Sequence, residues 1–296
     1  MRLDNQAASD NIEDRRGGGR GRMIAGLGGG GGIIAVILML LVNFLGGNPG
    51  AQQNAAGPNN VGFQRPDAVA PGAELTPEEK QQGEFCAKVL GSTETVWGDI
   101  FSANRLRYKE PKLVLFSGST MSGCGGASAN SGPFYCPADE KVYLDTMFFV
   151  QLERQFRAPG DFARAYVIAH EVGHHVQNLI GSTRDMDRKR RQLGPNSAEY
   201  NNLSVRLELQ ADFFAGVWAH HAQRNGSIQL DMGDLEEALG AARAIGDDTL
   251  QRNAGRAPRV ETFTHGSSAQ RIRWFRKGFE SGDLAQGDTF DPNVRL

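Results

Sequence analysis

A ten-residue segment in the middle of the chain constrains the fold more than any other feature. Residues 166–175 read Tyr-Val-Ile-Ala-His-Glu-Val-Gly-His-His and place His170 and His174 four positions apart. On an α-helix, side chains at positions i and i+4 share one face, so these two imidazoles converge on one point. A Zn²⁺ ion takes nitrogen ligands from this spacing at about 2.0–2.1 Å. The sequence therefore predicts a helix that supplies two metal ligands.

Glu171 follows His170 directly and is rotated by roughly 100° around the same helix. We expect its carboxylate beside the open side of the metal, where it can accept the proton of a zinc-bound water. We expect Asp161 to cap this helix and Gly181 to end it. Apolar residues recur between them at helical spacing, which indicates a packed face: Phe162, Tyr166, Ala169, Val172, Val176 and Leu179.

A second helical segment, residues 207–216, offers the third ligand. Glu208 and Asp212 are four positions apart and lie on one helix face. We expect Glu208 to complete a site for one zinc ion with three protein ligands, which leaves the fourth position for water. Asp212 is expected to accept a hydrogen bond from the non-ligating N–H of one histidine and to fix its tautomer. The metzincin extension is excluded, because Gln177 and Ile180 stand where it has Gly and a third His.

The first 75 residues differ in composition from the rest of the chain. Residues 1–22 are polar and mixed in charge, which predicts a disordered cytoplasmic tail. Residues 23–45 carry no charge and are long enough for a transmembrane anchor. A cleaved signal peptide is the alternative, but the polar N-terminal region is long and no Ala-x-Ala site follows Leu45. Residues 46–75 predict a flexible linker, which leaves residues 76–296 as the folded domain.

The charge distribution suggests where this domain lies. Arg15, Arg16, Arg20 and Arg22 lie shortly before the uncharged segment, and the positive-inside rule then predicts a single-pass membrane protein with the catalytic domain outside the cytoplasm. The formal net charge is −2 and the isoelectric point about 6.3. These values give no reason to expect nucleic acid as a partner.

The patterns within the domain predict an α+β fold that is mostly helical and has a small β-sheet, in addition to the N-terminal transmembrane helix. The glycine- and serine-rich stretch 117–132 is expected to be a loop and the charged stretch 182–195 a solvated connection. Strands are expected at 112–116, 134–136 and 142–145, and further helices at 76–101, 146–156, 196–225, 234–245 and 267–279.

Two of the three cysteines bracket the predicted loop. We expect Cys124 and Cys136 to form a disulfide in an exported domain, with a contribution of roughly 3 kcal/mol for a loop of this size. A structural metal is the weaker interpretation, because no histidine lies nearby. Cys86 is expected to be a buried free thiol, and an intermolecular bridge is the alternative.

Hydrolysis at a zinc site also needs a donor to the developing oxyanion. His265 lies just before Ser267-x-x-Gln270, a capping box that opens a helix. It is the best candidate for this second catalytic residue, and an ordinary loop histidine is the alternative. Tyr200 is a weaker candidate.

With these residues assembled, the chain resembles the bacterial neutral zinc metallopeptidase family. The similarity covers essentially residues 76–290 and also the opening Ser-Asp-Asn-Ile-Glu-Asp-Arg-Arg at 9–16. The resemblance implies a zincin fold of the Glu-ligand (gluzincin) type in a membrane-anchored peptidase. The segments that carry it are 132–137, 166–176, 208–216, 233–248 and 264–283.

The resemblance also implies residue roles. The metal residues of the family match His170, His174 and Glu208, and its catalytic carboxylate matches Glu171. Some relatives carry cysteines where this chain has Phe213 and Gly287. One disulfide of those relatives is therefore expected to be missing here, with the metal site intact.

The expected function is zinc-dependent hydrolysis of a peptide or protein substrate, with Glu171 as general base and then as proton donor to the leaving amine. We expect the substrate to lie along an exposed edge of the strand at 142–145. A membrane-tethered binding domain with structural zinc is one alternative, and a closed coordination sphere, for example through His175, would indicate it. A zinc amidase acting on cell-wall peptides is another alternative, which shares the chemistry.

Overall fold

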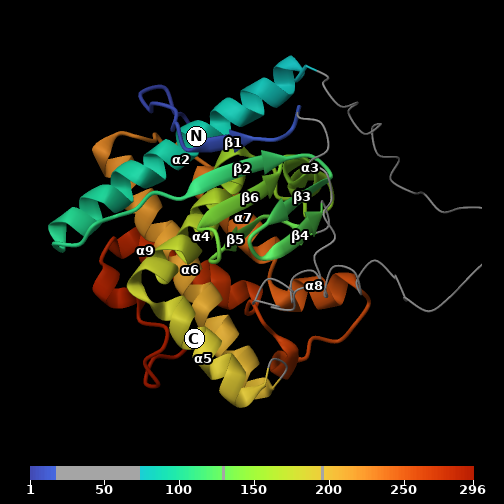
Figure 1. The fold of residues 1–296 in the computed structure, drawn as a ribbon. Helices are drawn as coiled ribbons and strands as arrows, with labels where there is room; N and C mark the ends of the chain where they lie inside the picture. Colours follow the sequence, from blue (N-terminus) through green and yellow to red (C-terminus); the bar gives the residue numbers. More distant parts are fainter. Residues whose placement is uncertain (18–73, 129–130, 195–196) are drawn as a thin grey trace, which may run out of the picture.

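A computed structural model describes residues 1–17, 74–128, 131–194 and 197–296. Helices make up most of this α+β fold, and Figure 1 shows the sheet on one side with α6 and α9 on the other. The helices are α2 (Pro77–Ala103), α3 (Met147–Arg154), α4 (Asp161–Ile180), α5 (Ser182–Leu193), α6 (Ala198–Asn225), α7 (Asp234–Ala244), α8 (Asp247–Asn253), α9 (Ser268–Ser281), and the 3₁₀ turns η2 (Val260–Thr262) and η3 (Leu284–Gly287).

The main sheet has four strands in the order β1-β2-β6-β5. These are β1 (Ile12–Asp14), β2 (Lys112–Phe116), β6 (Lys141–Asp145) and β5 (Phe134–Cys136). The first three are parallel, and β5 runs antiparallel to β6. The predicted strands at 112–116, 134–136 and 142–145 are thus confirmed. The prediction that the substrate lies along a free edge of the strand at 142–145 is wrong, because β6 is an interior strand. β2 pairs along one side of it and β5 pairs along the other.

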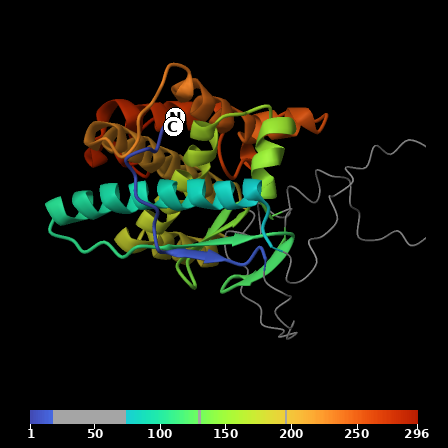
Figure 2. The same cartoon turned by 90° about the horizontal axis from the view of Figure 1, so that it is seen from above.

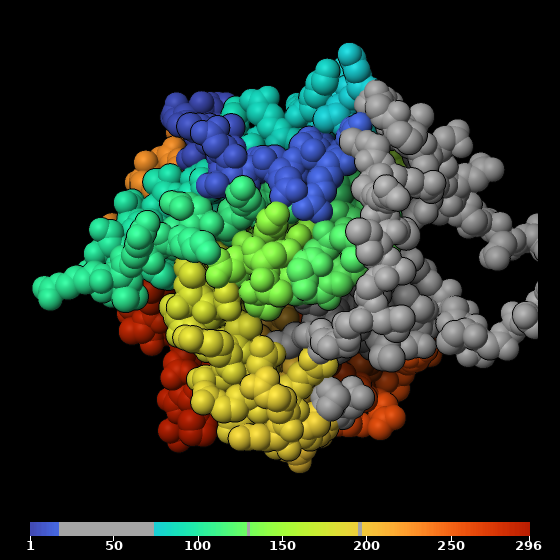
Figure 3. Space-filling view, in the orientation of Figure 1, coloured from blue at the N-terminus to red at the C-terminus, as the bar shows by residue number. Residues whose placement is uncertain are grey.

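The N-terminal segment, residues 1–17, packs on the domain, so the prediction of a disordered tail is wrong for these residues. Asn11 O accepts from the Leu113 amide at 2.9 Å, and the Arg15 amide donates to Leu115 O at 2.8 Å. Figure 3 shows this segment in blue on the surface beside α2 and the sheet. Polar composition alone predicted disorder, whereas the backbone of the segment finds hydrogen-bond partners along the edge of β2.

This packing contradicts the predicted single-pass topology. One membrane crossing between residues 17 and 74 would put β1 and β2 on opposite sides of the bilayer, yet they are paired in one sheet. None of the helices in the described residues is long and apolar enough to cross a membrane. The predicted anchor at 23–45 and the linker up to residue 73 lie outside those residues. The fold class is corrected to α+β for the described chain, and the predicted localisation and membrane partner are not supported.

The helix α4 lies between the sheet and the helices α6 and α7, and contacts all three. Figure 2 shows α2 running along this assembly, and α2 packs against both α4 and α6. Gly173 permits the close approach of α4 to α6, because a Cβ at this position would lie 2.9 Å from the Ala211 carbonyl oxygen. The two helices that carry the candidate ligands therefore lie in direct backbone contact.

Several helix ends follow from local sequence. Thr76 and Glu79 form a capping box on α2, and Ser267 and Gln270 form another on α9. Gly181 ends α4 in the left-handed conformation, as predicted. The N-terminus of α4 differs from the prediction.

Asp161 is the first residue of α4 and Gly160 is its cap. The Glu237 carboxylate of α7 accepts from the Phe162 amide at 3.1 Å and thus supplies the missing cap from another helix. At the start of α6, Ser197 caps by accepting from the Tyr200 amide, and residue 196, where this helix was expected to begin, lies outside the described residues.

Two segments expected to be irregular contain regular structure. Within 117–132, β3 (Ser119–Ser122) and β4 (Gly125–Ser128) form an antiparallel hairpin. Within 182–195, α5 buries Thr183 and Met186 although the helix is strongly charged. Glycine, serine and charge content obscured both elements, because each depends on a few contacts with the rest of the fold.

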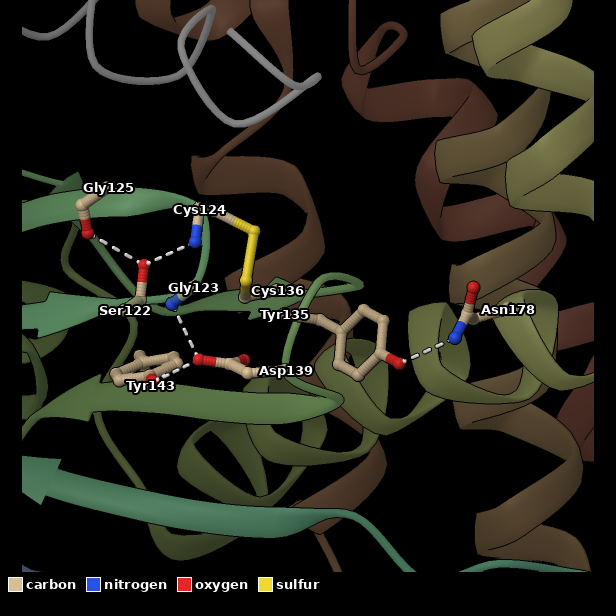
Figure 4. Close-up of a disulfide and its surroundings, with 9 residues drawn as sticks. All are labelled: Ser122, Gly123, Cys124, Gly125, Tyr135, Cys136, Asp139, Tyr143 and Asn178. Atoms are coloured by element: carbon tan, nitrogen blue, oxygen red, sulfur yellow. Dashed lines mark hydrogen bonds between the residues drawn. A yellow bond between two sulfur atoms is a disulfide. The ribbon is translucent and has the colours of Figure 1, made fainter. Parts of the chain in front are cut away.

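The predicted disulfide between Cys124 and Cys136 is present and joins the hairpin turn to β5. Figure 4 shows Asp139 below it, where Oδ2 accepts from the Gly123 amide and from the Tyr143 hydroxyl, both at 2.6 Å. Cys86 is buried as a free thiol, as predicted, and burial raises its pKa to about 12. This thiol is therefore protonated at neutral pH.

We expect reduction of the disulfide, or the double substitution C124S/C136S, to lower the free energy of unfolding by about 3 kcal/mol, because the bond closes a short loop in the unfolded chain. The melting temperature should fall by roughly 6–12 °C. Thermal unfolding with and without reductant measures this. Reductant should not alter the melting temperature of the double variant, and an equal shift there would contradict the assignment to this bond.

Candidate metal centre

The structure brings three predicted ligands together. One ligand atom from each of His170, His174 and Glu208 lies within 4.8 Å of the others. Glu208 Oε2 is 3.2 Å from Nε2 of His170 and 3.5 Å from Nε2 of His174. The two histidines come from consecutive turns of α4 and the carboxylate from α6. Both helices are regular here, so the spacing of four residues suffices to direct these side chains to one place.

Asp212 lies one turn beyond Glu208 and contacts the other nitrogen of His170. Its Oδ1 is 2.8 Å from His170 Nδ1, and it also accepts a hydrogen bond from the Tyr166 hydroxyl. Arg271 of α9 donates to both carboxylate oxygens, at 2.8 and 2.9 Å. Although burial opposes its ionisation, Arg271 and His170 lower the pKa of Asp212 to about 2. The carboxylate therefore stays ionised and accepts a hydrogen bond from the Nδ1–H group of His170.

A metal ion fits the donor atoms of this centre. In the neutral ring, His170 Nδ1 donates to Asp212, which leaves on Nε2 a lone pair that faces Glu208 Oε2. Two such acceptors at 3.2 Å repel each other unless a cation or a proton lies between them. Burial disfavours a charged imidazole, but the carboxylates of Asp212 and Glu208 outweigh it and raise the pKa of His170 to about 9. Two imidazoles and one carboxylate are a typical set of protein ligands in a zinc hydrolase.

Glu171 lies on α4 next to this cluster and is largely buried, with 7% of its surface exposed. Its side chain makes no hydrogen bond or ion pair with other described residues, so the carboxylate is available to accept a proton from a bound molecule. His175 lies in the same helix but serves another purpose. Its Nε2 donates to the Lys109 carbonyl at 2.6 Å and its Nδ1 accepts from the Tyr135 hydroxyl at 3.1 Å.

His265 contacts Asp247, the first residue of α8. Asp247 accepts from the backbone amides of residues 264, 265 and 266 and lies 3.2 Å from Nδ1 of His265. Burial favours the neutral ring, but Asp247 raises the pKa of His265. The charge of His265 also reaches Glu208, where it helps His174 and His170 to lower the pKa against the effect of burial. His265 thus lies in the electrostatic environment of the metal centre.

Tyr200, the weaker candidate donor, is also buried, and its hydroxyl finds no hydrogen-bond partner in the described part of the chain. Burial raises its pKa, so the hydroxyl keeps its proton. It packs with Met186 and Leu207 in a small apolar cluster. Its packing contacts do not include a candidate ligand, although the charge of Glu208 contributes to the rise in its pKa.

Three residues of the site were not predicted from the sequence: Tyr166 and Arg271, which hold Asp212, and Gln177, which lies 2.8 Å from Nδ1 of His174. Arg271 had a detectable signal. The buried face of α9 consists of residues 268, 271, 274, 275 and 278, so an arginine occupies one position of an otherwise uncharged stripe. Such a buried cation requires an anionic partner. Tyr166 and Gln177 gave no signal that distinguishes them from core residues.

The fold and this site define a mostly helical α+β protein with a His–His–Glu cluster that could hold a metal ion. A family model described as "Putative neutral zinc metallopeptidase" matches residues 1–290, and the chain belongs to that family. The match includes the N-terminal segment, which packs on the domain.

Curated relatives extend over most of the chain. The protein YpfJ of Escherichia coli strain K12, named as uncharacterized, is 43% identical over 309 residues that cover 99% of this chain and 100% of YpfJ. The uncharacterized protein Rv2575 of Mycobacterium tuberculosis strain H37Rv is 41% identical over 252 residues, with 79% of this chain and 82% of Rv2575 covered. No solved structure matches the chain.

Proposed function

We propose that this protein is a zinc-dependent peptidase that hydrolyses peptide bonds in peptides or proteins. The observation that carries the proposal is the convergence of His170, His174 and Glu208 beside Glu171. Membership of the family supports it as well. The three converging side chains would hold one zinc ion, and the ion would supply a Lewis acid and an activated water to the reaction.

Glu171 acts as the general base in this proposal. Its carboxylate takes the proton of the attacking water and later gives it to the leaving amine nitrogen. Asp212 keeps the proton of His170 on Nδ1, so that Nε2 remains a ligand. Arg271 neutralises the charge of Asp212 and holds it in place by two hydrogen bonds.

His265 stabilises the oxyanion in the proposed mechanism. Asp247 occupies the Nδ1 side of the ring, which leaves Nε2 free for the substrate. Since Asp247 raises the pKa of His265, the ring is more often protonated than a free imidazole at the same pH. Nε2 is then a hydrogen-bond donor, which is what a developing negative oxygen requires.

His175, the example of a fourth ligand that would indicate the binding-domain alternative, is bonded through both nitrogens to other groups. It therefore does not close the coordination sphere. A glutamate kept beside the site without a partner has a use in hydrolysis and none in a purely structural centre.

The test is cleavage of a peptide library by the purified full chain, before and after removal of metal by a chelator. We expect cleavage by the untreated protein, loss of cleavage after chelation and recovery with one equivalent of zinc. E208A should bind zinc weakly and cleave poorly in parallel. A chain that holds zinc tightly and cleaves no peptide would refute the proposed function.

A further inference from the structure

Gln177 contacts a candidate metal ligand although it is not a ligand itself. It is fully buried on α4, one turn after His174, and its Oε1 lies 2.8 Å from His174 Nδ1. We propose that Gln177 is a positioning residue that holds His174 in the tautomer with Nε2 free for the metal. The inference rests on the proposed function only in requiring that zinc binds at this centre.

The orientation of the Gln177 amide follows from its partners. Its Nε2 lies 2.7 Å from the Leu207 carbonyl oxygen, and a carbonyl oxygen can only accept a hydrogen bond. The NH₂ end must therefore face Leu207, and the oxygen must face His174. Gln210 agrees with this orientation, because its Oε1 lies 3.2 Å from the same Nε2 while its own NH₂ group donates to the Gly287 carbonyl at 3.1 Å.

The orientation of the amide decides the tautomer of His174. Since Oε1 of Gln177 has no proton, the hydrogen bond requires a proton on Nδ1 of His174. Nε2 then carries the lone pair, and this atom faces Glu208 Oε2 at 3.5 Å. A backbone carbonyl of α6 thus determines, through Gln177, which nitrogen of His174 is free to bind a metal.

The Gln177 side chain also connects the candidate ligands His174 and Glu208. Leu207 directly precedes Glu208, so Gln177 links the His174 ring to the backbone beside the third ligand. The two histidines are held differently, since a carboxylate on α6 holds His170 and a neutral amide on α4 holds His174. Partners of this kind typically change metal affinity by about 10–100-fold when they are removed.

The experiment compares Q177M with Q210M in the full chain. Both variants replace a buried glutamine of one network by an apolar side chain of similar length, but only Gln177 contacts a ligand. We expect Q177M to raise the zinc Kd by about 10–100-fold and to shift the visible spectrum of the Co²⁺-substituted protein, and Q210M to leave both close to wild type. Q177E keeps the acceptor oxygen and should bind zinc more tightly than Q177M. Competition with a chromogenic chelator measures each Kd.

Equal zinc affinity of Q177M and wild type, or an equal loss in Q210M, would overturn the proposal. Histidine ¹H–¹⁵N spectra of the zinc-bound wild type test it without any variant, should Q177M fail to fold. We expect a proton on His174 Nδ1 and coordination through Nε2, and coordination through Nδ1 would overturn the inference. A wild-type chain that binds no zinc would overturn both proposals, whereas one that binds zinc and cleaves no peptide would overturn only the proposed function.

Discussion

Replacing Glu171 with glutamine is expected to lower kcat for peptide cleavage by roughly 10²–10⁴-fold, because an amide of the same size cannot accept the proton of the attacking water. Zinc content should not change, since the converging ligand atoms belong to His170, His174 and Glu208. Steady-state cleavage of a fluorogenic peptide and the zinc stoichiometry of the same samples measure the two quantities.

The matched control is E199Q, which makes the same chemical change at an exposed position in the first turn of α6. It should retain wild-type kcat and zinc content. Full activity of E171Q would refute the assignment of Glu171 as general base. Loss of zinc together with loss of activity in E171Q would mean that the carboxylate supports the metal centre rather than the proton transfer.

The candidate ligands could be predicted because each pair depends on local geometry alone. His170 and His174 are one turn apart on α4, and Glu208 and Asp212 are one turn apart on α6, so the sequence itself fixes which side chains share a face. That the two faces meet was inferred from chemistry. The structure adds the physical reason, which is the backbone contact that Gly173 permits between the two helices.

Contacts between distant residues limited the prediction elsewhere. The cap of α4 comes from Glu237, which is 75 residues away from the amide it accepts, so no local pattern could reveal it. Phe213 and Gly287, the positions at which the resemblance implies cysteines in some relatives, meet in space. A Cβ on Gly287 would lie 2.4 Å from the Phe213 ring, so the aromatic ring occupies the space between the two backbones.

The order of the N-terminal segment, residues 1–17, was not predicted for a related reason. It lacks the apolar period of a strand, and β1 has only three residues, so nothing in residues 1–17 indicates order when they are considered alone. Order arises from the edge of β2 and from a buried arginine. Arg16 forms an ion pair with Asp14 at 2.6 Å and donates to the Glu79 carbonyl at 2.7 Å.

A chain that begins at residue 74 is therefore expected to be less stable than the full chain by roughly 3–6 kcal/mol, since buried backbone groups on several elements lose their partners. The groups concerned are the Leu113 amide and the carbonyls of Ala87 and Leu115, which now bond to residues 9–15. Gly91 of α2 indicates how closely the segment is fitted, because a Cβ there would lie 2.6 Å from the Ala7 carbonyl oxygen. Urea unfolding of both chains measures the difference.

Two arginine substitutions within the segment separate specific packing from the general effect of a deletion. R16M removes a guanidinium whose side chain is 1% exposed and leaves Asp14 without its partner, which should cost about 2–3 kcal/mol because Asp14 itself is partly solvated. R2M makes the same change where both partners, Arg2 and Asp231, are about half exposed, and should cost less than about 1 kcal/mol. Equal effects of the two variants, or a chain from residue 74 as stable as the full protein, would mean that residues 1–17 do not belong to the folded domain.

Because β1 adds at a sheet edge, a synthetic peptide of residues 1–17 should restore part of the stability that the chain from residue 74 has lost, in a concentration-dependent manner.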